Sequence, residues 1–207
     1  MKTKDKIIET AKYLFNQYGY WNVTIRMIAS EMDISSGNLN YHYKKRADIL
    51  EDLYFRMVAE FDYQAEQSKE KSITFRKIKE DIKIIMTSMM TYKFFWTDLY
   101  SLTNNFPKLH RHFSEAYRKR LGGYQFLFYF LRQKGFMKSD IEQTEQSRLA
   151  ERMIHFLDTW IFYSQIYGPN ESIISIDKQA DELLMNLYPY LTAEGKIEMD
   201  SICAIAI

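Results

Sequence analysis

Apolar residues recur at helical spacing through most of this chain. Within the first segment, residues 3–18, one stripe consists of Ile7, Ala11, Leu14, Phe15 and Tyr18. Gly19 follows the stripe and predicts the end of that helix. The same three- and four-residue steps predict further helices over residues 47–68, 74–91, 92–104, 107–134, 144–167 and 176–191. The tail, residues 192–207, has no clear period, and the pattern as a whole predicts an all-α fold.

Two shorter helices are predicted before residue 47. Thr24 can cap one of them and Ser35 the other, because both side chains accept hydrogen bonds from free backbone N–H groups. Their inward residues are expected to be Ile25, Ile28, Ala29, Met32, Leu39 and Tyr43. Only residues 32–34 separate them, and two short helices joined so closely form a helix-turn-helix. Asp33 stands where this turn commonly has glycine, and Asp tolerates the left-handed conformation better than most residues.

Composition narrows the class of protein. The 207 residues are 46% apolar and 27% charged, which is ordinary for a globular chain, and 7 Gly with 3 Pro disfavour a turn-rich β-sandwich or barrel. The longest apolar run near the middle, residues 126–131, is too short to span a bilayer. No apolar signal region follows the first lysines, and a single cysteine excludes an internal disulfide. We expect a cytoplasmic protein with no membrane partner.

Charge is distributed unevenly along the chain. Residues 1–50 carry 8 Lys and Arg against 5 Asp and Glu, whereas residues 51–207 carry 20 against 22. A basic head favours a polyanionic partner. A solvated surface explains the same surplus equally well.

The first fifty residues contain a motif with several elements at fixed spacing. A Thr-capped helix has Ile-Ala in its middle, a Ser-x-Gly segment opens the next helix, and an aromatic-His-aromatic end precedes a basic residue. These elements are Thr24, Ile28–Ala29, Ser35–Ser36–Gly37, Leu39, Tyr41–His42–Tyr43 and Arg46. The segment resembles the tetracycline-repressor (TetR) family of bacterial transcriptional regulators. The resemblance implies a three-helix helix-turn-helix DNA-binding domain over residues 1–46, followed by a larger helical effector-binding and dimerisation domain over residues 47–207 (about nine helices).

The residue types in the third helix suit contact with bases. A recognition helix enters the major groove with its first turn leading, so small polar residues are expected there. The first turns of this helix contain Ser36, Gly37, Asn38 and Asn40. Gly37 would allow close backbone approach, and the two amides can pair with adenine. The family commonly has Tyr where this chain has Asn40.

Other residues of the motif suit phosphate contacts. Thr24 stands at a helix N-terminus, where free N–H groups attract phosphate. Tyr41 and His42 carry donors at the end of the third helix, and Arg46 adds charge beyond it. By resemblance, the positions that touch DNA are Thr24, Gly37, Tyr41, His42 and Arg46. Each has a plainer explanation, as a structural histidine, a packing tyrosine or a solvated basic run, and for Tyr43 we prefer packing.

No catalytic or metal-binding arrangement is evident. His110 and His112 are two residues apart, which is the wrong spacing for a shared metal on a helix. The chain has no glycine-rich phosphate loop and no converging pair of acids. We therefore expect no enzyme activity, no catalytic residues, no metal site and no cofactor.

The second part of the chain has aromatic stripes that fit either a core or a ligand wall. The candidate effector-binding residues are Phe113, Tyr117, Tyr124, Phe128, His155 and Trp160. Asp158 would add a polar tip, while residues 118–120 are expected to face outward in part. Gly122 and Gly123 would allow close packing, a kink or space for a ligand. This wall favours a small apolar or aromatic effector.

The last two predicted helices are candidates for subunit contact. Residues 144–167 are apolar on more than one side, and residues 176–191 carry a leucine stripe. Family resemblance implies a homodimer through these helices, with Leu183 and Leu187 at the interface. The alternative is that both stripes are buried within one subunit.

These patterns together predict a one-component transcriptional regulator. We expect it to repress from a pseudo-palindromic double-stranded DNA operator and to be released by a small-molecule effector. One alternative is a helical ligand-binding or scaffold protein without DNA binding, which the net charge of +1 would suit. Another is a small helical enzyme acting on a hydrophobic substrate.

Overall fold

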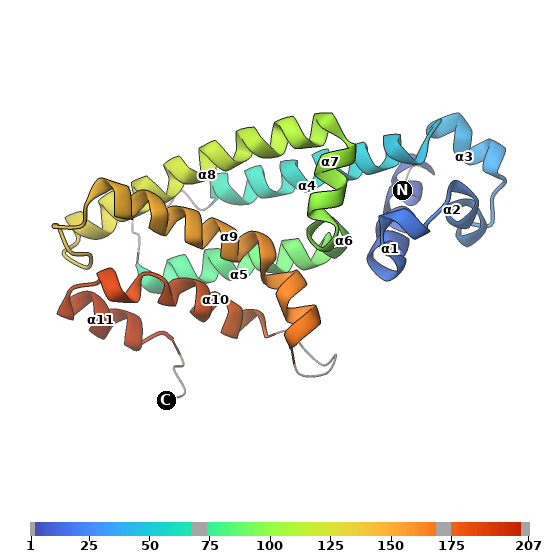
Figure 1. Ribbon diagram of the computed structural model, residues 1–207. Helices are drawn as coiled ribbons and strands as arrows, with labels where there is room; N and C mark the ends of the chain where they lie inside the picture. The colour runs from blue at the N-terminus through green and yellow to red at the C-terminus, as the bar shows by residue number, and fades with distance from the viewer. Residues whose placement is uncertain (1–2, 68–73, 169–174, 204–207) are drawn as a thin grey trace. The chain divides into compact units, whose positions relative to one another are not determined.

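A computed structural model describes residues 3–67, 74–168 and 175–203 of the chain, and those residues form an all-α fold (Figure 1). They contain eleven α-helices and two short 3-10 helices, η1 and η2. Within the same ranges no β-strand forms, although an isolated bridge pairs Met137 with Leu191. The predicted all-α fold class is confirmed.

The first helices follow the sequence prediction closely. Their bounds are α1 Thr3–Tyr18, η1 Tyr20–Asn22, α2 Ile25–Glu31, α3 Ser36–His42 and α4 Arg46–Gln67. Gly19 ends α1 with φ of 76°, a conformation that glycine adopts without steric cost. The remaining helices are α5 Phe75–Thr91, α6 Lys93–Thr97, α7 Leu99–Asn105, α8 Pro107–Gln133, α9 Gln143–Tyr167, α10 Ile176–Met185, η2 Tyr188–Tyr190 and α11 Ala193–Asp200.

Two expectations about the later helices were wrong in detail, and the tail contains a helix that its pattern did not indicate. The helix expected over residues 92–104 is interrupted at Asp98, whose carboxylate accepts a 3.4 Å hydrogen bond from the backbone N–H of Tyr20. The helix expected over 176–191 ends at Met185 and is followed by η2, which contains Pro189. The tail contains α11, capped by Thr192, whereas residues 204–207 lie outside the described ranges.

Contacts divide the chain into two compact units. Unit 1 consists of Met1–Glu66 and Met89–His110, and unit 2 of Gln67–Ser88 and Arg111–Ile207. Unit 1 therefore holds more than the segment 1–46 expected to bind DNA. Its aromatic core explains this, because Phe15 of α1 packs 5.3 Å from Phe94 of α6 between ring centroids, and Tyr54 of α4 packs 5.2 Å from Phe95.

The helix-turn-helix forms as predicted. The Thr24 hydroxyl accepts a 3.2 Å hydrogen bond from the N–H of Met27, and the Ser35 hydroxyl accepts one of 3.1 Å from Asn38. Asp33 lies between the two helices with φ of 53°, in the left-handed region. The short connection thus depends on two side-chain caps and one residue in a costly backbone conformation.

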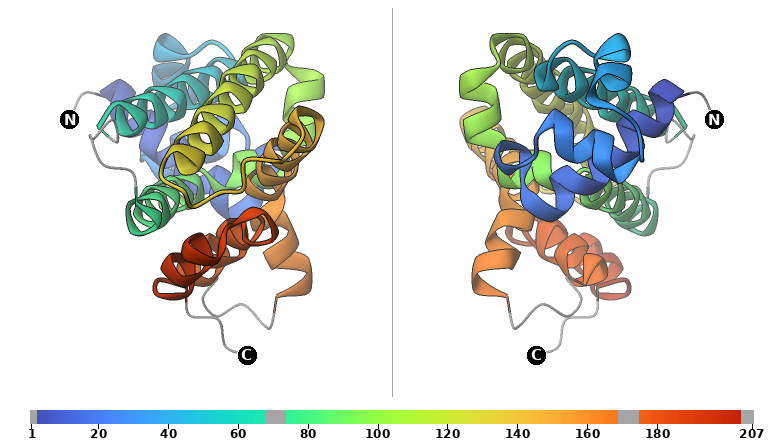
Figure 2. Two further views of the ribbon diagram at one scale, coloured as in Figure 1. Left: turned by 90° about the vertical axis from the view of Figure 1, so that its left-hand side faces the viewer. Right: turned by 90° about the vertical axis from the view of Figure 1, so that its right-hand side faces the viewer.

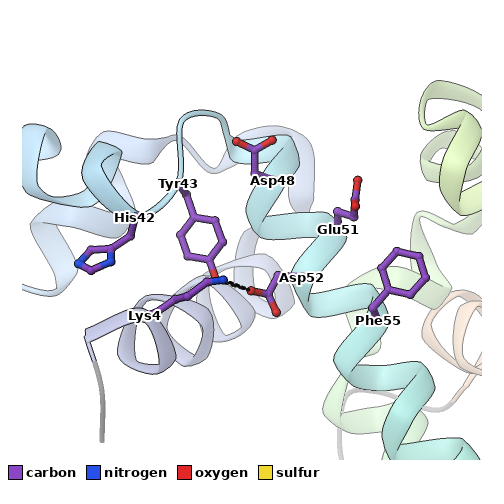
Figure 3. Close-up of a pocket in the computed structure, with 7 residues that line it drawn as sticks. All are labelled: Lys4, His42, Tyr43, Asp48, Glu51, Asp52 and Phe55. Atoms are coloured by element: carbon purple, nitrogen blue, oxygen red, sulfur yellow. Dashed lines mark hydrogen bonds and ion pairs between the residues drawn. The ribbon is translucent and has the colours of Figure 1, made fainter.

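The C-terminal end of α3 is anchored to α4 and α1. The Tyr43 hydroxyl donates a 2.5 Å hydrogen bond to Asp52, which also pairs with Lys4 at 3.2 Å (Figure 3). The other oxygen of Asp52 accepts from Arg56 at 2.7 Å. Burial opposes ionisation of Asp52, but these three donors together hold the pKa of its carboxyl below the usual range. Burial and the hydrogen bond to Asp52 raise the pKa of Tyr43. The preferred packing role of Tyr43 is therefore what the structure shows.

Unit 2 is built from α8 to α11 with most of α5. The rings of Phe75 and Phe136 pack 5.5 Å apart, and Lys79 of α5 forms a 2.6 Å ion pair with the buried Asp181 of α10. Helices α10 and α11 lie side by side in the views of Figures 1 and 2, and a 3.2 Å hydrogen bond from Tyr188 to Asp200 links the segment after α10 to the end of α11.

Substitution of Asp33 tests the turn. Asp33→Ala should lower the free energy of unfolding by about 1 kcal/mol, because a β-carbon without a local polar group is disfavoured at positive φ. Asp33→Gly should leave stability unchanged or raise it, because glycine has no such cost. Urea unfolding followed by circular dichroism measures both. Equal effects of the two substitutions would contradict the left-handed turn.

Acid unfolding tests the anchor at Asp52. Because the folded-state pKa of Asp52 is depressed, its stabilisation is complete above pH ~4 and is lost as pH falls through that lowered pKa. Asp52→Asn should therefore cost about 1–3 kcal/mol at pH 7 and much less near pH 2. Asp62→Asn, at an exposed position of the same helix, serves as the control. A loss that is the same at both pH values would refute the anchor.

Candidate nucleic-acid interface and effector site

Helix α3 separates an inward side from an outward side. Leu39 is fully buried, whereas Gly37, Asn38 and Tyr41 are exposed, and Tyr41 exposes 80% of its surface. Ser36 is half-buried. An exposed aromatic ring beside an exposed amide, on a seven-residue helix held at both ends, suits contact with another molecule. The predicted base-reading residues other than Asn40 thus lie together on the outward side of α3.

The space around Gly37 would admit a larger side chain. A β-carbon at this position would meet nothing nearer than the Ser35 hydroxyl oxygen at 3.7 Å, which is an ordinary contact. Its φ is also outside the positive range that favours glycine. The folded chain would therefore accept alanine at position 37. A requirement for glycine would have to come from a molecule that binds at α3.

Asn40 is less available than expected. It is half-buried, and its side-chain oxygen is buried without a hydrogen-bond partner in the part of the chain that the structure describes. A bidentate contact with adenine needs both the oxygen and the nitrogen of the amide. Of the two predicted amides, Asn38 is therefore the one that is displayed.

Arg46 is engaged within unit 1. One of its terminal nitrogens donates to the backbone oxygen of Val23 and, at 3.2 Å, to that of Trp21. Its guanidinium lies 4.2 Å from the ring centroid of Tyr20, which suits a cation–π contact. The structure thus gives Arg46 an internal role, joining the start of α4 to η1, alongside the phosphate contact predicted for it.

Two neighbouring lysines are more available than Arg46. Lys44 and Lys45 are exposed between α3 and α4. The backbone N–H of Lys45 donates to Asp48 at 2.9 Å, which fixes the loop while leaving the side chain outside. The basic run 44–46 indicated in the sequence that cationic side chains lie after α3. The sequence could not show which of the three side chains turns inward.

His42 lies at the edge of an open pocket of about 400 Å³. The pocket is lined by Lys4, His42, Tyr43, Asp48, Glu51, Asp52 and Phe55, and in Figure 3 the His42 ring is directed away from Asp52. Three carboxylates in this lining repel phosphate. A DNA contact by His42 would therefore use the side of the ring that faces away from the pocket.

The predicted effector wall is brought together only in part. On α8, the rings of Tyr124 and Phe128 lie 6.1 Å apart, with Phe128 fully buried and Tyr124, Tyr117 and Phe113 half-buried. Burial raises the pKa of Tyr124 to about 12. On α9, His155 is exposed.

Trp160, also on α9, is buried, unlike His155. It is 2% exposed, and its indole nitrogen has no hydrogen-bond partner among the described residues. Positions 155 and 160 lie on different sides of a helix, so these two residues do not share a face.

An ion pair that sequence reasoning missed lies beside this wall. Arg120 of α8 contacts both carboxylate oxygens of Asp158 of α9, at 3.1 and 2.8 Å, and the Asp158 side chain is 13% exposed. Residues 118 and 119 face outward as expected, whereas Arg120 turns inward. The signal was its spacing, because residue 120 falls three positions after Tyr117 and four before Tyr124.

Leu183 and Leu187 are both fully buried within the single chain. They fit the alternative in which the leucine stripe packs inside one subunit, so their side chains have no surface left for a partner. Several exposed apolar residues of unit 2 cluster instead on α9 and α8. This cluster comprises Phe162, Tyr163, Ile166 and Tyr167 on α9, with Phe126 and Tyr129 on α8.

Gly122 and Gly123 do not interrupt α8, and a β-carbon at either would meet nothing within 4 Å. Both are exposed, so they line no internal space. Within residues 3–67, 74–168 and 175–203, no group of three His, Cys, Asp or Glu side chains could hold a metal ion. None of the helices in these ranges combines the length and the hydrophobicity of a membrane span.

Comparison with known proteins identifies the family. Residues 7–53 match the model of "Bacterial regulatory proteins, tetR family", and residues 56–199 match that of "Bacterial transcriptional repressor". A curated relative, the probable HTH-type transcriptional regulator YttP of Bacillus subtilis, is 27% identical over 93 residues, covering 45% of this chain. The match spans 44% of that relative's length.

Solved structures share the fold. A TetR-family transcriptional regulator from Marinobacter aquaeolei has a TM-score of 0.84 at 24% identity, with 97% of each chain covered. A putative transcriptional regulator from Saccharomonospora viridis, solved in complex with choline, has a TM-score of 0.70 at 20% identity, covering 91% of this chain and 96% of that one. None of these relatives is described as an enzyme. With family models matching both of its parts, the chain belongs to the tetracycline-repressor family of bacterial transcriptional regulators.

Proposed function

We propose that this protein represses transcription as a homodimer bound to a pseudo-palindromic operator, and that a small molecule bound in unit 2 releases it. The observation that carries the proposal is α3, a short helix capped by Ser35, anchored through Tyr43 and displaying Asn38 and Tyr41 to solvent. A helix that is firmly held while its outer side is free has the geometry needed to read a major groove.

Phosphate contacts would surround this helix. Thr24 stands exposed at the start of α2, and Lys44 and Lys45 are exposed beyond the end of α3. Such contacts fix the position of the protein on the duplex and make binding sensitive to salt. Arg46 would then support binding mainly through its contacts with η1, and its loss should lower stability as well as affinity.

Gly37→Ala separates DNA binding from folding. Alanine is favoured over glycine in a helix by up to about 1 kcal/mol, and the chain has room for its methyl group, so thermal stability should stay equal or rise. Operator affinity should nevertheless fall at least tenfold, because the added methyl group obstructs the approach of α3 to base edges. Lys45→Ala is the comparison, and it should weaken binding to all sequences and reduce the salt slope by about 1.

Fluorescence anisotropy with labelled operator DNA measures both variants. Unchanged affinity for the Gly37→Ala protein would contradict the proposal that α3 enters the groove with its first turn leading.

We propose the outer side of α9 as the dimer interface, in place of Leu183 and Leu187. Phe162 and Ile166 are four residues apart on α9, so they share one side, and they expose 49% and 53% of their surfaces. Clustered exposed apolar side chains on one helix favour burial against a partner. Family members typically pair as dimers, which supports a second copy of this chain as that partner.

Charged substitutions on α9 test the interface. Ile166→Glu combined with Phe162→Glu should give a folded monomer, because both side chains face outward. Tyr100→Glu, at a position 82% exposed in unit 1, should remain dimeric. Sedimentation velocity at micromolar concentration distinguishes the two states, and circular dichroism checks folding. A dimer in the doubly substituted protein would place the interface elsewhere.

A further inference from the structure

The ring of Trp21 is exposed although its neighbours hold it in place. The residue exposes 42% of its surface. Its ring stacks on Phe106, with centroids 6.2 Å apart and an interplanar angle of 24°, and meets the ring of Tyr20 edge-on at 5.0 Å. Its indole N–H has no acceptor among the residues that the structure describes. An exposed ring with an unused donor is typical of a contact surface, because indole combines a large apolar area with one hydrogen-bond donor.

Arg46 connects Trp21 to the basic loop that follows α3. Nη1 of Arg46 donates to the backbone oxygen of Trp21 at 3.2 Å, and the guanidinium lies 6.0 Å from the centroid of the indole ring. Arg46 directly follows the exposed Lys44 and Lys45. Trp21 itself stands three residues before Thr24, which is exposed and caps α2. Trp21 therefore lies where the two segments expected to touch phosphate meet.

The charge around Trp21 favours a polyanion. Segments 20–26 and 44–46 together contain four basic residues and no acidic one. Arg26, Lys44 and Lys45 are exposed, and none of them pairs with a carboxylate among the described residues. Asp48 and Asp98 approach these segments, but each accepts a hydrogen bond from a backbone N–H there. A phosphate backbone would supply both the negative charge and an acceptor for the indole donor.

We propose that Trp21 is a DNA-backbone contact in each subunit, with its indole N–H donating to a phosphate oxygen beside the phosphate that Thr24 approaches. This inference rests on the proposed function, because it adds a residue to the same DNA-binding surface. Stacking on Phe106 would orient the ring in advance, so binding would cost little side-chain entropy. A phosphate contact carries no base information, so Trp21 should strengthen binding to every sequence and help to position α3 on the duplex.

Tryptophan fluorescence tests the contact without any substitution. The chain has three tryptophans, and Trp96 and Trp160 expose only 6% and 2% of their surfaces. Acrylamide in solution should therefore quench chiefly Trp21. The probe is a duplex that the full chain selects from a random pool, and a saturating amount should reduce acrylamide quenching, because DNA would cover the ring. Quenching that stays unchanged at saturation would overturn the proposal.

Trp21→Phe tests the hydrogen bond, because phenylalanine keeps a ring against Phe106 but lacks the N–H donor. Affinity should fall about three- to tenfold, by the same factor for the selected duplex and for random DNA, with an unchanged melting temperature. The DNA-dependent change in quenching should disappear. Fluorescence anisotropy with labelled duplexes measures the affinities. Wild-type affinity in the Trp21→Phe protein, or a loss confined to the selected duplex, would refute the contact.

Tyr100→Phe is the matched control. It also removes a donor from an exposed aromatic residue of unit 1, which is 82% exposed and lies outside both segments. Its affinity for DNA should equal that of the wild type. If Trp21→Phe fails to fold, the quenching of the wild-type protein decides by itself.

Neutral phosphates distinguish a direct contact from an effect on the fold. Selected duplexes that each carry a single methylphosphonate, at successive positions of a half-site, lose one phosphate charge at a time. The wild type should lose affinity at a position where the Trp21→Phe protein shows no further loss, because that protein already lacks the contact. Equal losses in both proteins at every position would mean that Trp21 acts only through the fold, and the proposal would fail.

Failure of this inference is separable from failure of the proposed function. Salt-sensitive operator binding that leaves the quenching of Trp21 unchanged defeats this inference alone. Failure of the wild type to bind any selected duplex defeats the proposed function.

Discussion

A helix of seven residues cannot persist by itself in water, and the DNA-facing side of this protein depends on that constraint. Helix α3 buries one side chain completely, Leu39, so packing alone holds it weakly. The Ser35 cap satisfies its first turn, and the Tyr43–Asp52 hydrogen bond secures its end to α4. Because the helix is fixed at its ends and on one side, its outer residues can be presented in a constant orientation. Base reading requires such constancy, since a hydrogen bond fails when its geometry is displaced.

A few side-chain contacts likewise fix the start of α4, and Arg46 makes them. Helix α4 starts at this residue, and its guanidinium joins that start to η1 through two backbone oxygens and the Tyr20 ring. Asp98, at the break between α6 and α7, bonds to the backbone of the same Tyr20. Contacts within unit 1 thus lead from the segment after the recognition helix to the α6–α7 region without interruption.

Much of the fold was predictable because local signals were strong. The bounds of α1, the two caps at Thr24 and Ser35 and the left-handed Asp33 all follow from residue types and spacing. The break at Asp98 and the short α11 depend on tertiary contacts, and a periodic pattern does not report those. The same limit applies to the sites. Residues 118–120 were all expected to face outward in part, and only the partner on α9 shows that Arg120 is the half-buried one of the three.

Side-chain burial also redirected two site expectations. The leucines Leu183 and Leu187 were expected to contact a partner subunit, yet they pack inside the chain, whereas apolar residues of α9 remain exposed. Asn40 looked equivalent to Asn38 in the sequence, but the helical turn places one amide inward and the other outward. In both cases the residue type indicated what the side chain could contact. The direction in which the side chain points could be learned only from the packing of the neighbouring helices.

Two copies of α3 should read one duplex as a pair. Selection of bound duplexes from a random pool, at near-physiological salt, should therefore enrich an inverted repeat whose half-sites are centred about one helical turn apart, roughly 34 Å along the duplex. Binding to the enriched sequence should weaken steeply as salt rises. No enrichment over the starting pool, or enrichment of one asymmetric element bound by a single subunit, would contradict it.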